Sequence, residues 1–250
     1  MHDVVDLDWS FVERGRKQMR EMGACEIPGF VRADALPLFI EDARRLAPRA
    51  HRSGGPGTVY LGFPDESFPV DHPRQWLGNY GVGAVAYDLF PDDSPIRRLY
   101  EWEELLQFVA AILGLDVIHP YADPLGALNL AVMGDGDELQ WHFDQTDFVV
   151  SLALQDADDG GDFEVAPMIR SADDERYDDV ARVLAGDHTN VVTLPMTPGT
   201  LLVFAGRHSL HRVSPIRGKT PRLVGLFGYD AKPGTMSSEL LKEVRYGRVA

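Results

Sequence analysis

The chain has 250 residues, which suits one large domain with a substantial core. Its formal net charge of -15 argues against nucleic acid or an anionic membrane as the partner, because both would repel such a surface. The first residues form no targeting segment, no run of roughly 20 apolar residues follows, and the single cysteine, Cys25, cannot form an internal disulfide. We therefore expect a cytoplasmic protein with a small-molecule partner, and the sequence allows a homodimer.

Helical signals dominate the first part of the chain. Ser10 and Glu13 have capping-box spacing ahead of a helix that Gly23 ends, since glycine adopts the left-handed closing conformation at little cost. A short strand is predicted at 24–27. The apolar residues of 36–46 then repeat at helical spacing, which predicts a packing helix.

From about Pro48 to Asn79 the apolar pattern is lost among glycines and prolines. The same stretch carries four large aromatic residues, Tyr60, Phe63, Phe68 and Trp76. A loop of this length with aromatic side chains is uncommon unless it covers a site, and we expect such a cover. A second packing helix is predicted for 101–113, where Gly114 stops it.

Beyond residue 115 the pattern changes to that of a sheet. Predicted strands occupy residues 117–121, 127–133, 138–155, 162–167, 190–194, 200–204, 209–213 and 222–229. The sequence G-D-G-D at 134–137 is typical of a hairpin turn, and 173–184 is predicted to be a helical insertion that Gly186 ends. About eight closely spaced strands after helices predict a mainly β fold with flanking helices, in which a jelly roll forms the core.

We find no internal repeat and no linker that would divide the chain. The prediction is therefore a single domain over 1–250. It consists of a helical N-terminal support at about 1–115, a jelly-roll core at about 116–230 and a C-terminal segment at 231–250.

His142 and Asp144 lie two residues apart at the centre of the run E-L-Q-W-H-F-D-Q. Residues two apart on a strand point to the same face, so an imidazole and a carboxylate can converge there on one ion. A second histidine comes from F-A-G-R-H-S-L-H-R-V, which offers His208 and His211. Two histidines and one carboxylate with open positions are the ligand set of non-haem Fe(II) oxygenases.

Each of these residues also has an ordinary structural interpretation. A lone H-x-D occurs by chance on surface strands, and His211 could be a satisfied core histidine. Arg222, eleven residues beyond His211, could form a surface salt bridge of little consequence. The combined spacing of the four residues favours the metal site.

Residues 128–230 resemble the double-stranded β-helix core of the Fe(II)/2-oxoglutarate-dependent oxygenases. The likeness rests on W-H-F-D, G-G-D-F-E-V-A-P, P-G-T-L-L-V-F-A-G-R-H-S-L-H-R-V and T-P-R-L-V-G-L-F-G-Y-D. Within that superfamily the chain resembles the branch of free-amino-acid radical halogenases and related hydroxylases. The N-terminal G-A-C-E-I-P-G-F-V extends the likeness to most of the chain.

The resemblance implies that His142, Asp144 and His211 bind Fe(II) and that Arg222 holds the distal carboxylate of 2-oxoglutarate. A guanidinium fits a carboxylate bidentately and keeps its charge at any working pH. Asn129 is a candidate for a lateral contact with 2-oxoglutarate, although an amide that bonds only within its own sheet is an equal alternative. His211 is preferred to His208 as the iron ligand. The eleven-residue separation between His211 and Arg222 and the motif R-V-x-P after His211 both match the family pattern.

Asp144 departs from the halogenase pattern. In radical halogenases of this type a small residue, commonly glycine, stands at the carboxylate position and leaves room for chloride. The aspartate here favours hydroxylation. The implied activity is that of a 2-oxoglutarate-dependent dioxygenase, an oxidoreductase that uses O2 to hydroxylate an unactivated C–H bond of a free amino acid or a derivative.

Substrate contacts are predicted from position alone. Gln145 and Asp147 follow the metal motif, and Arg74, near the end of the covering loop, could bind a substrate carboxylate, although a solvated position is the alternative for each. Arg245 and Tyr246 follow a helical segment, S-S-E-L-L-K-E-V, that could fold over the pocket or join subunits. Rival functions are desaturation, cyclisation or halogenation by the same oxidant, or a jelly-roll binding protein without catalysis.

Overall fold

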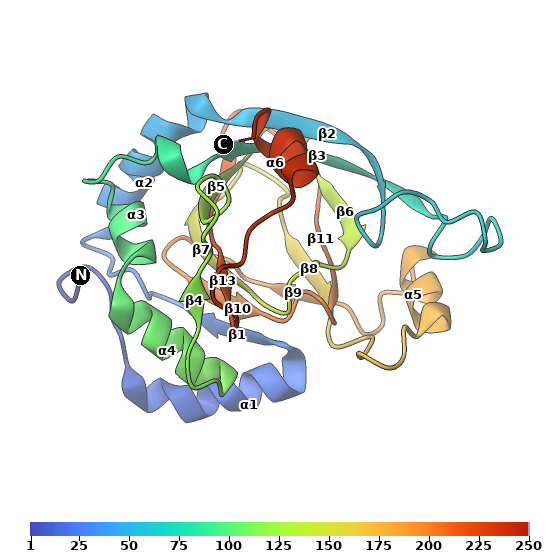
Figure 1. Ribbon diagram of the computed structural model, residues 1–250, viewed down its shortest axis with the longest axis horizontal. Helices are drawn as coiled ribbons and strands as arrows, with labels where there is room; N and C mark the ends of the chain where they lie inside the picture. The colour runs from blue at the N-terminus through green and yellow to red at the C-terminus, as the bar shows by residue number, and fades with distance from the viewer. Residues whose placement is uncertain (250) are drawn as a thin grey trace.

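The computed structural model describes residues 1–249 and shows a strongly curved antiparallel sheet with most of its helices on one side (Figure 1). The α-helices are α1 (Val12–Met22), α2 (Leu36–Leu46), α3 (Pro95–Tyr100), α4 (Glu103–Leu113), α5 (Tyr177–Leu184) and α6 (Glu239–Tyr246). Short 3-10 turns are η1 (Trp9–Phe11), η2 (Ala47–Arg49) and η3 (Tyr87–Leu89).

The strands are β1 (Ala24–Ile27), β2 (His51–Thr58), β3 (Leu77–Val85), β4 (His119–Pro120), β5 (Leu128–Met133), β6 (Leu139–His142), β7 (Val149–Gln155), β8 (Phe163–Ala166), β9 (Val192–Leu194), β10 (Leu201–Phe204), β11 (Leu210–Val213), β12 (Arg222–Phe227) and β13 (Tyr229–Asp230). The main ladder runs β1-β10-β7-β12-β5-β3-β6-β11-β8-β9, with β2 on β3, and β4 pairs with β13. This nearly closed antiparallel ladder confirms the predicted mainly β fold with a jelly-roll core.

The main core lies between helices α1 to α4 and the outer face of the β1-β10-β7-β12-β5 part of the sheet (Figure 1). On β5, Leu128 and Leu130 belong to this core, whereas Met133 packs with Val213 and Ile216 in a different cluster. Because side chains alternate along a strand, Asn129 shares the inner face with Met133. The inner face is the one that carries the candidate site.

The stretch 138–155 is not one strand, as the sequence suggested, but two strands, β6 and β7, which lie at different places in the ladder. The turn at 134–137 is not a hairpin turn either. Leu130 pairs with Val85 and Leu139 pairs with Tyr80, so the chain continues along the same edge of β3 after the turn. Glycine and aspartate suit a hairpin turn and equally suit a turn after which the chain continues in the same direction. The residue types at 134–137 therefore could not distinguish the two.

The predicted loop at 48–79 contains a strand, since β2 pairs with β3 from His51 to Thr58. Glycine and proline suggested a loop, but here they permit a close approach. A Cβ at Gly54 would lie 2.7 Å from the carbonyl oxygen of Tyr80, and one at Gly57 would lie 2.9 Å from the Tyr80 ring. The region 1–115, predicted as a helical support, therefore also contributes β1, β2 and β3 to the sheet.

Smaller differences have local causes. Asp8, rather than Ser10, accepts the backbone N–H at the first helical turn. The helix predicted from 173 begins at Tyr177, because Arg176 has a left-handed backbone with φ 49°. Gly23 and Gly114 end α1 and α4 in the left-handed conformation, as predicted. No helix within 1–249 is long and apolar enough to cross a membrane.

Candidate metal centre

His142 and His211 face each other directly across the β6 and β11 ladder. Their ring centroids are 4.2 Å apart, and the ring of Phe204 lies edge-on to that of His211 at 4.8 Å. The next paired residues are Leu139 and Val213, so three residue steps on β6 oppose two on β11. Such a bulge changes the direction of a side chain, and here it accompanies the turn of His142 toward the inner face.

Both imidazoles are oriented by backbone carbonyl groups. Nδ1 of His142 lies 2.8 Å from the carbonyl oxygen of Gln140, and Nδ1 of His211 lies 2.9 Å from that of Ser209. A carbonyl oxygen can only accept, so Nδ1 carries the proton and donates it in each ring. Nε2 then keeps a free lone pair, which is the arrangement typical of metal-binding histidines.

Asp144 supplies the third donor although it lies beyond the end of β6. Its backbone N–H donates to the carbonyl oxygen of Gly206 at 3.0 Å, and its Oδ2 lies 3.5 Å from Nε2 of His211. The donor atoms of His142, Asp144 and His211 all lie within 4.8 Å of one another. A Cβ at Gly206 would lie 1.7 Å from Oδ2, so this carboxylate position requires glycine there.

The charges of the three side chains suit a divalent cation. Burial lowers the pKa of His142 to about 4, and the nearby His211 acts in the same direction, so the imidazole is neutral near pH 7. Burial opposes ionisation of Asp144, but the imidazoles of His211 and His142 hold the pKa of its carboxyl below the ordinary value. The donor set therefore fits Fe(II) with positions left for 2-oxoglutarate and O2.

His208, the rival for the second histidine, is not part of this donor group. Its Nδ1 is buried without a hydrogen-bond partner within residues 1–249. Burial and the cations of Arg170 and Arg207 lower the pKa of His208. The geometry thus brings His211, rather than His208, to His142 and Asp144.

Arg222 is a buried cation at the start of β12. Its side chain is 8% exposed, and within the described chain it makes neither a hydrogen bond nor an ion pair. Burial lowers the pKa of Arg222 to about 10, against the influence of Asp156 and Asp162, so it remains charged near pH 7. A buried cation without a protein partner is costly and fits an anionic ligand such as the distal carboxylate of 2-oxoglutarate.

Asn129 lies on the inner face of β5, opposite Leu226 on β12. Nη2 of Arg245, from α6, lies 3.5 Å from its Oδ1. Its amide group can still donate, which suits the predicted contact with an anionic ligand. Arg222 and Leu226 are four residues apart on β12, about 13 Å along an extended strand, so Arg222 and Asn129 project from well-separated points of the sheet.

The predicted substrate residues all bond to other protein groups. Gln145 and Asp147 are exposed, and Arg207 binds both, through the carbonyl oxygen of Gln145 and through the Asp147 carboxylate at 2.5 Å. Nε of Arg74 donates to the Tyr177 hydroxyl at 2.8 Å. None of these three residues belongs to the donor group of the metal centre, and their contact with a substrate stays a prediction.

Arg74 belongs instead to a set of contacts between two segments. Its guanidinium lies 4.4 Å from the centroid of the Tyr60 ring and 3.6 Å from Glu175, which also pairs with Arg170 at 2.7 Å. We call this set the latch: it joins the tip of the β2–β3 hairpin, residues 59–76, to the segment before α5. Within residues 1–249, the three non-glycine residues with a left-handed backbone, Leu61, Met168 and Arg176, all lie in these two segments.

Two residues near the metal centre, Tyr80 and Gly206, have no sequence signal that would have identified them. Tyr80 packs its ring edge-on against His142 at 5.8 Å and donates to the carbonyl oxygen of Trp141 at 3.1 Å. Gly206 leaves room for the Asp144 carboxylate. Arg245 was predicted to belong to a C-terminal helix, but its position beside Asn129 depends on tertiary structure.

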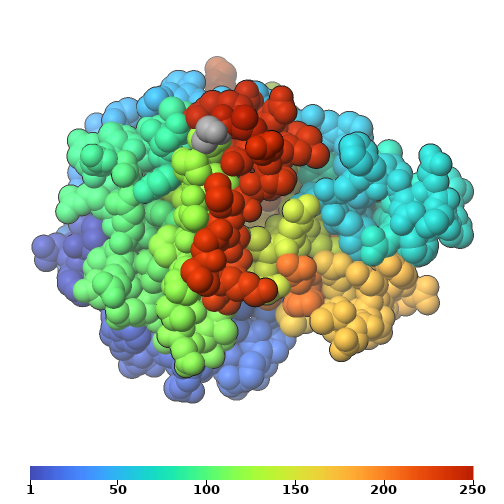
Figure 2. All heavy atoms as spheres, in the orientation of Figure 1, coloured from blue at the N-terminus to red at the C-terminus, as the bar shows by residue number. Residues whose placement is uncertain are grey.

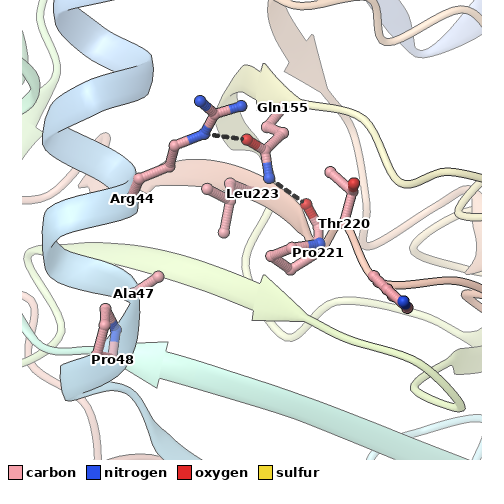
Figure 3. Close-up of a pocket in the computed structure, with 8 residues that line it drawn as sticks. Arg44, Ala47, Pro48, Gln155, Thr220, Pro221 and Leu223 are labelled. Atoms are coloured by element: carbon pink, nitrogen blue, oxygen red, sulfur yellow. Dashed lines mark hydrogen bonds between the residues drawn. The ribbon is translucent and has the colours of Figure 1, made fainter.

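A surface cavity of about 440 Å³ lies away from this centre, between α2 and the start of β12 (Figure 3). Arg44 donates to Gln155, which donates in turn to the carbonyl oxygen of Pro221. These bonds use both polar atoms of the Gln155 side chain. None of the predicted site residues lines it.

The fold is similar to that of several solved structures. AviO1 from Streptomyces viridochromogenes has a TM-score of 0.61 at 22% identity, with 93% of this chain and 99% of that chain covered. A 2OG-Fe(II) oxygenase family oxidoreductase from Burkholderia pseudomallei has a TM-score of 0.58 at 16% identity, with coverage of 92% and 95%. The epimerase SnoN, in complex with Fe3+, alpha ketoglutarate and nogalamycin RO, has a TM-score of 0.62 at 16% identity, with coverage of 89% and 84%.

This fold, together with the two-histidine, one-carboxylate centre, defines the class as the Fe(II)/2-oxoglutarate oxygenases, the class of enzyme predicted from the sequence. Residues 86–245, more than half of the chain, match the family model described as Halogenase D, and the chain belongs to that family. The predicted likeness to the halogenase branch is thereby confirmed. No curated protein matches the chain.

Proposed function

We propose that this enzyme hydroxylates an unactivated C–H bond of a small polar substrate, a free amino acid or a derivative of one. The observation that carries the proposal is the convergence of His142, Asp144 and His211 in a chain with a buried, unpaired Arg222. The two histidines and the carboxylate would hold Fe(II). Arg222 would bind the distal carboxylate of 2-oxoglutarate.

Iron with 2-oxoglutarate and O2 supplies the oxidising power for C–H cleavage. The protein residues orient the metal ligands and pack around them. The carbonyl groups of Gln140 and Ser209 fix the planes of the two imidazoles, and Phe204 and Tyr80 pack against them. Metal ligands that are held rigidly in this way keep the metal in a fixed position relative to the C–H bond of the substrate.

Asp144 favours hydroxylation over halogenation despite the family description. Its carboxylate occupies a position that a halide ligand would need, and Gly206 leaves the carboxylate room to do so. The chain is therefore adapted to a carboxylate at this position. Desaturation and cyclisation use the same ligands and remain rival outcomes, since an epimerase and a carbocyclase share the fold.

The test is product analysis by mass spectrometry after incubation with Fe(II), 2-oxoglutarate, O2 and individual amino acids in chloride buffer. We expect succinate and a product that is heavier than the substrate by one oxygen atom. A chlorinated principal product would overturn hydroxylation, and a product lighter by two hydrogens would favour desaturation. Metal and oxoglutarate binding without succinate formation would indicate a binding protein.

Asp144→Gly provides the matched variant. Removal of the charged donor should abolish most hydroxylation, because the iron loses one of its three protein ligands. Chloride can then be titrated into the variant to see whether a chlorinated product forms. Normal hydroxylation by this variant would show that Asp144 does not bind the metal.

A further inference from the structure

Helix α6 has the reverse of the usual burial pattern. Leu240 and Val244 are 65% and 55% exposed, whereas Lys242 is only 6% exposed. Arg245, one helical turn beyond Lys242 on the same face, is half-buried. A surface helix normally turns apolar residues inward. The inward cations of α6 therefore require another explanation.

The helix packs on β2 and β3, and Figure 1 shows it above the barrel. Tyr246 anchors it in a cluster with Ala84, Ala86 and Leu125. In Figure 2 the C-terminal segment lies across one face of the molecule, between the segment around residues 100–135 and the β2–β3 hairpin. The inner side of α6 thus faces β2 and β3, and β3 pairs with β6, the strand that carries His142.

Arg245 has unused hydrogen-bonding capacity. Its Nε is buried and has no partner within residues 1–249, and its one described contact is the 3.5 Å approach of Nη2 to Oδ1 of Asn129. Lys242 likewise has no side-chain partner among the described residues. The amide of Asn129 adds further donors. The side chains of Arg245, Lys242 and Asn129 therefore offer hydrogen-bond donors that few described acceptors use. Such a set of donors suits an anionic ligand.

We assign the distal carboxylate of 2-oxoglutarate to Arg222 and a different anion to Arg245. Asn129 lies about 13 Å along the sheet from Arg222, as judged from four residue steps on β12. Arg245 nevertheless reaches the face of the sheet that carries the metal centre, because its partner Asn129 lies on the inner face of β5. A second anion therefore fits on this inner face, beside Asn129 and Arg245.

The charges of the proposed assembly agree. Fe(II), the Asp144 carboxylate, dianionic 2-oxoglutarate and Arg222 together are neutral, with the histidines uncharged. Arg245 and Lys242 then add positive charge beneath α6, where a cation without a partner is unfavourable. A substrate carboxylate would give Arg245 the acceptor that it lacks.

We propose that Arg245, supported by Lys242 and Asn129, forms the subsite that binds the carboxylate of an amino-acid substrate. The inference rests on the proposed function and adds the substrate group that is recognised and the residues that recognise it. Arg245 acts as a specificity residue, since a guanidinium pairs bidentately with a carboxylate and poorly with a neutral amide.

The test measures succinate formation by the Fe(II)-loaded enzyme with the twenty standard L-amino acids, each added singly, and with the carboxamide of each active one. We expect at least one amino acid to raise the rate above the uncoupled rate and its carboxamide to fail. Arg245→Met should raise the KM for the active amino acid by about 10-fold to 100-fold, the loss of a charged hydrogen bond. The KM for the cosubstrate should not change.

Two further variants separate this role from a structural one. Arg245→Lys keeps the charge and should restore part of the affinity. Arg248→Met removes a cation from the same end of the chain, where Arg248 pairs with Asp88 at 2.6 Å, and should leave the KM unchanged.

Three results would overturn the subsite: equal activity of acid and carboxamide, an unchanged KM in Arg245→Met, or no response to any of the twenty amino acids while uncoupled succinate formation persists. Absence of succinate formation under all conditions would instead overturn the proposed function.

Discussion

The candidate site contains groups held by the sheet and groups held by loops. His142, His211 and Arg222 belong to paired strands, and the register of those strands fixes their neighbours. Asp144 lies outside a strand and is placed by one backbone hydrogen bond and by the space beside Gly206. The sheet-held groups are specified by many bonds at once, whereas the loop-held carboxylate depends on very few.

This difference suggests where the family can vary its chemistry. A change of a sheet-held histidine disturbs a ladder that also holds the fold. The position of Asp144 can change with only local consequences. Asp144, the ligand that we propose to favour hydroxylation over halogenation, therefore lies where strand pairing constrains the backbone least.

The largest expected effect concerns a sheet-held ligand. His211→Ala should abolish turnover and most iron binding, because it removes a donor that faces His142 across the ladder. His208→Ala is the matched control and should retain both, since His208 is outside the donor group. Iron content after reconstitution and succinate formation measure the two properties. The reverse pattern would make His208 the ligand.

Arg222→Ala should have the next largest effect. The variant loses the only proposed cation for the distal carboxylate of 2-oxoglutarate, so we expect the KM for this cosubstrate to rise by about 100-fold, as for a charge-assisted bidentate pair. Iron binding should remain close to that of the wild type, because Arg222 is not a metal ligand. An unchanged KM would remove Arg222 from the oxoglutarate site.

The sequence singled out the residues of the candidate metal centre because their signal is local. His142 and Asp144 are separated by one residue, and the spacing of His211 and Arg222 matches a recurring pattern. The jelly-roll core was predicted for the same reason, since alternating apolar runs define most of its strands.

The remaining features depend on contacts between distant segments. Glycine and proline made β2 look like a loop, because no local signal shows that Tyr80 lies against Gly54 and Gly57. The contact of Arg245 with Asn129 joins residues 116 positions apart. Gly206 is informative only once Asp144 is known to lie beside it.

Gly206→Ala tests the loop-held carboxylate directly. The backbone of Gly206 is not left-handed, so alanine is tolerated there, but its Cβ would occupy the position of Oδ2 of Asp144. We expect iron affinity to fall by about 10-fold, comparable to the loss of a supporting contact around a metal ligand. Gly62→Ala, where a Cβ would meet nothing within 4 Å, is the control and should bind iron normally. Equal iron affinity in both variants would mean that the carboxylate does not need this position.

The smallest expected effect concerns the latch, which is held entirely outside the main ladder. Arg74→Met and Tyr177→Phe each break the bond between the Arg74 guanidinium and the Tyr177 hydroxyl. Because they remove one shared contact, we expect each to reduce turnover by about threefold to 10-fold, near 1 kcal/mol, and the double variant to be no worse than the more impaired single one. The substrate KM and kcat of the three variants measure this coupling. If Arg74→Met alone raises the substrate KM while Tyr177→Phe behaves like the wild type, Arg74 binds substrate, as its position in the sequence suggested, and the contact with Tyr177 only orients it.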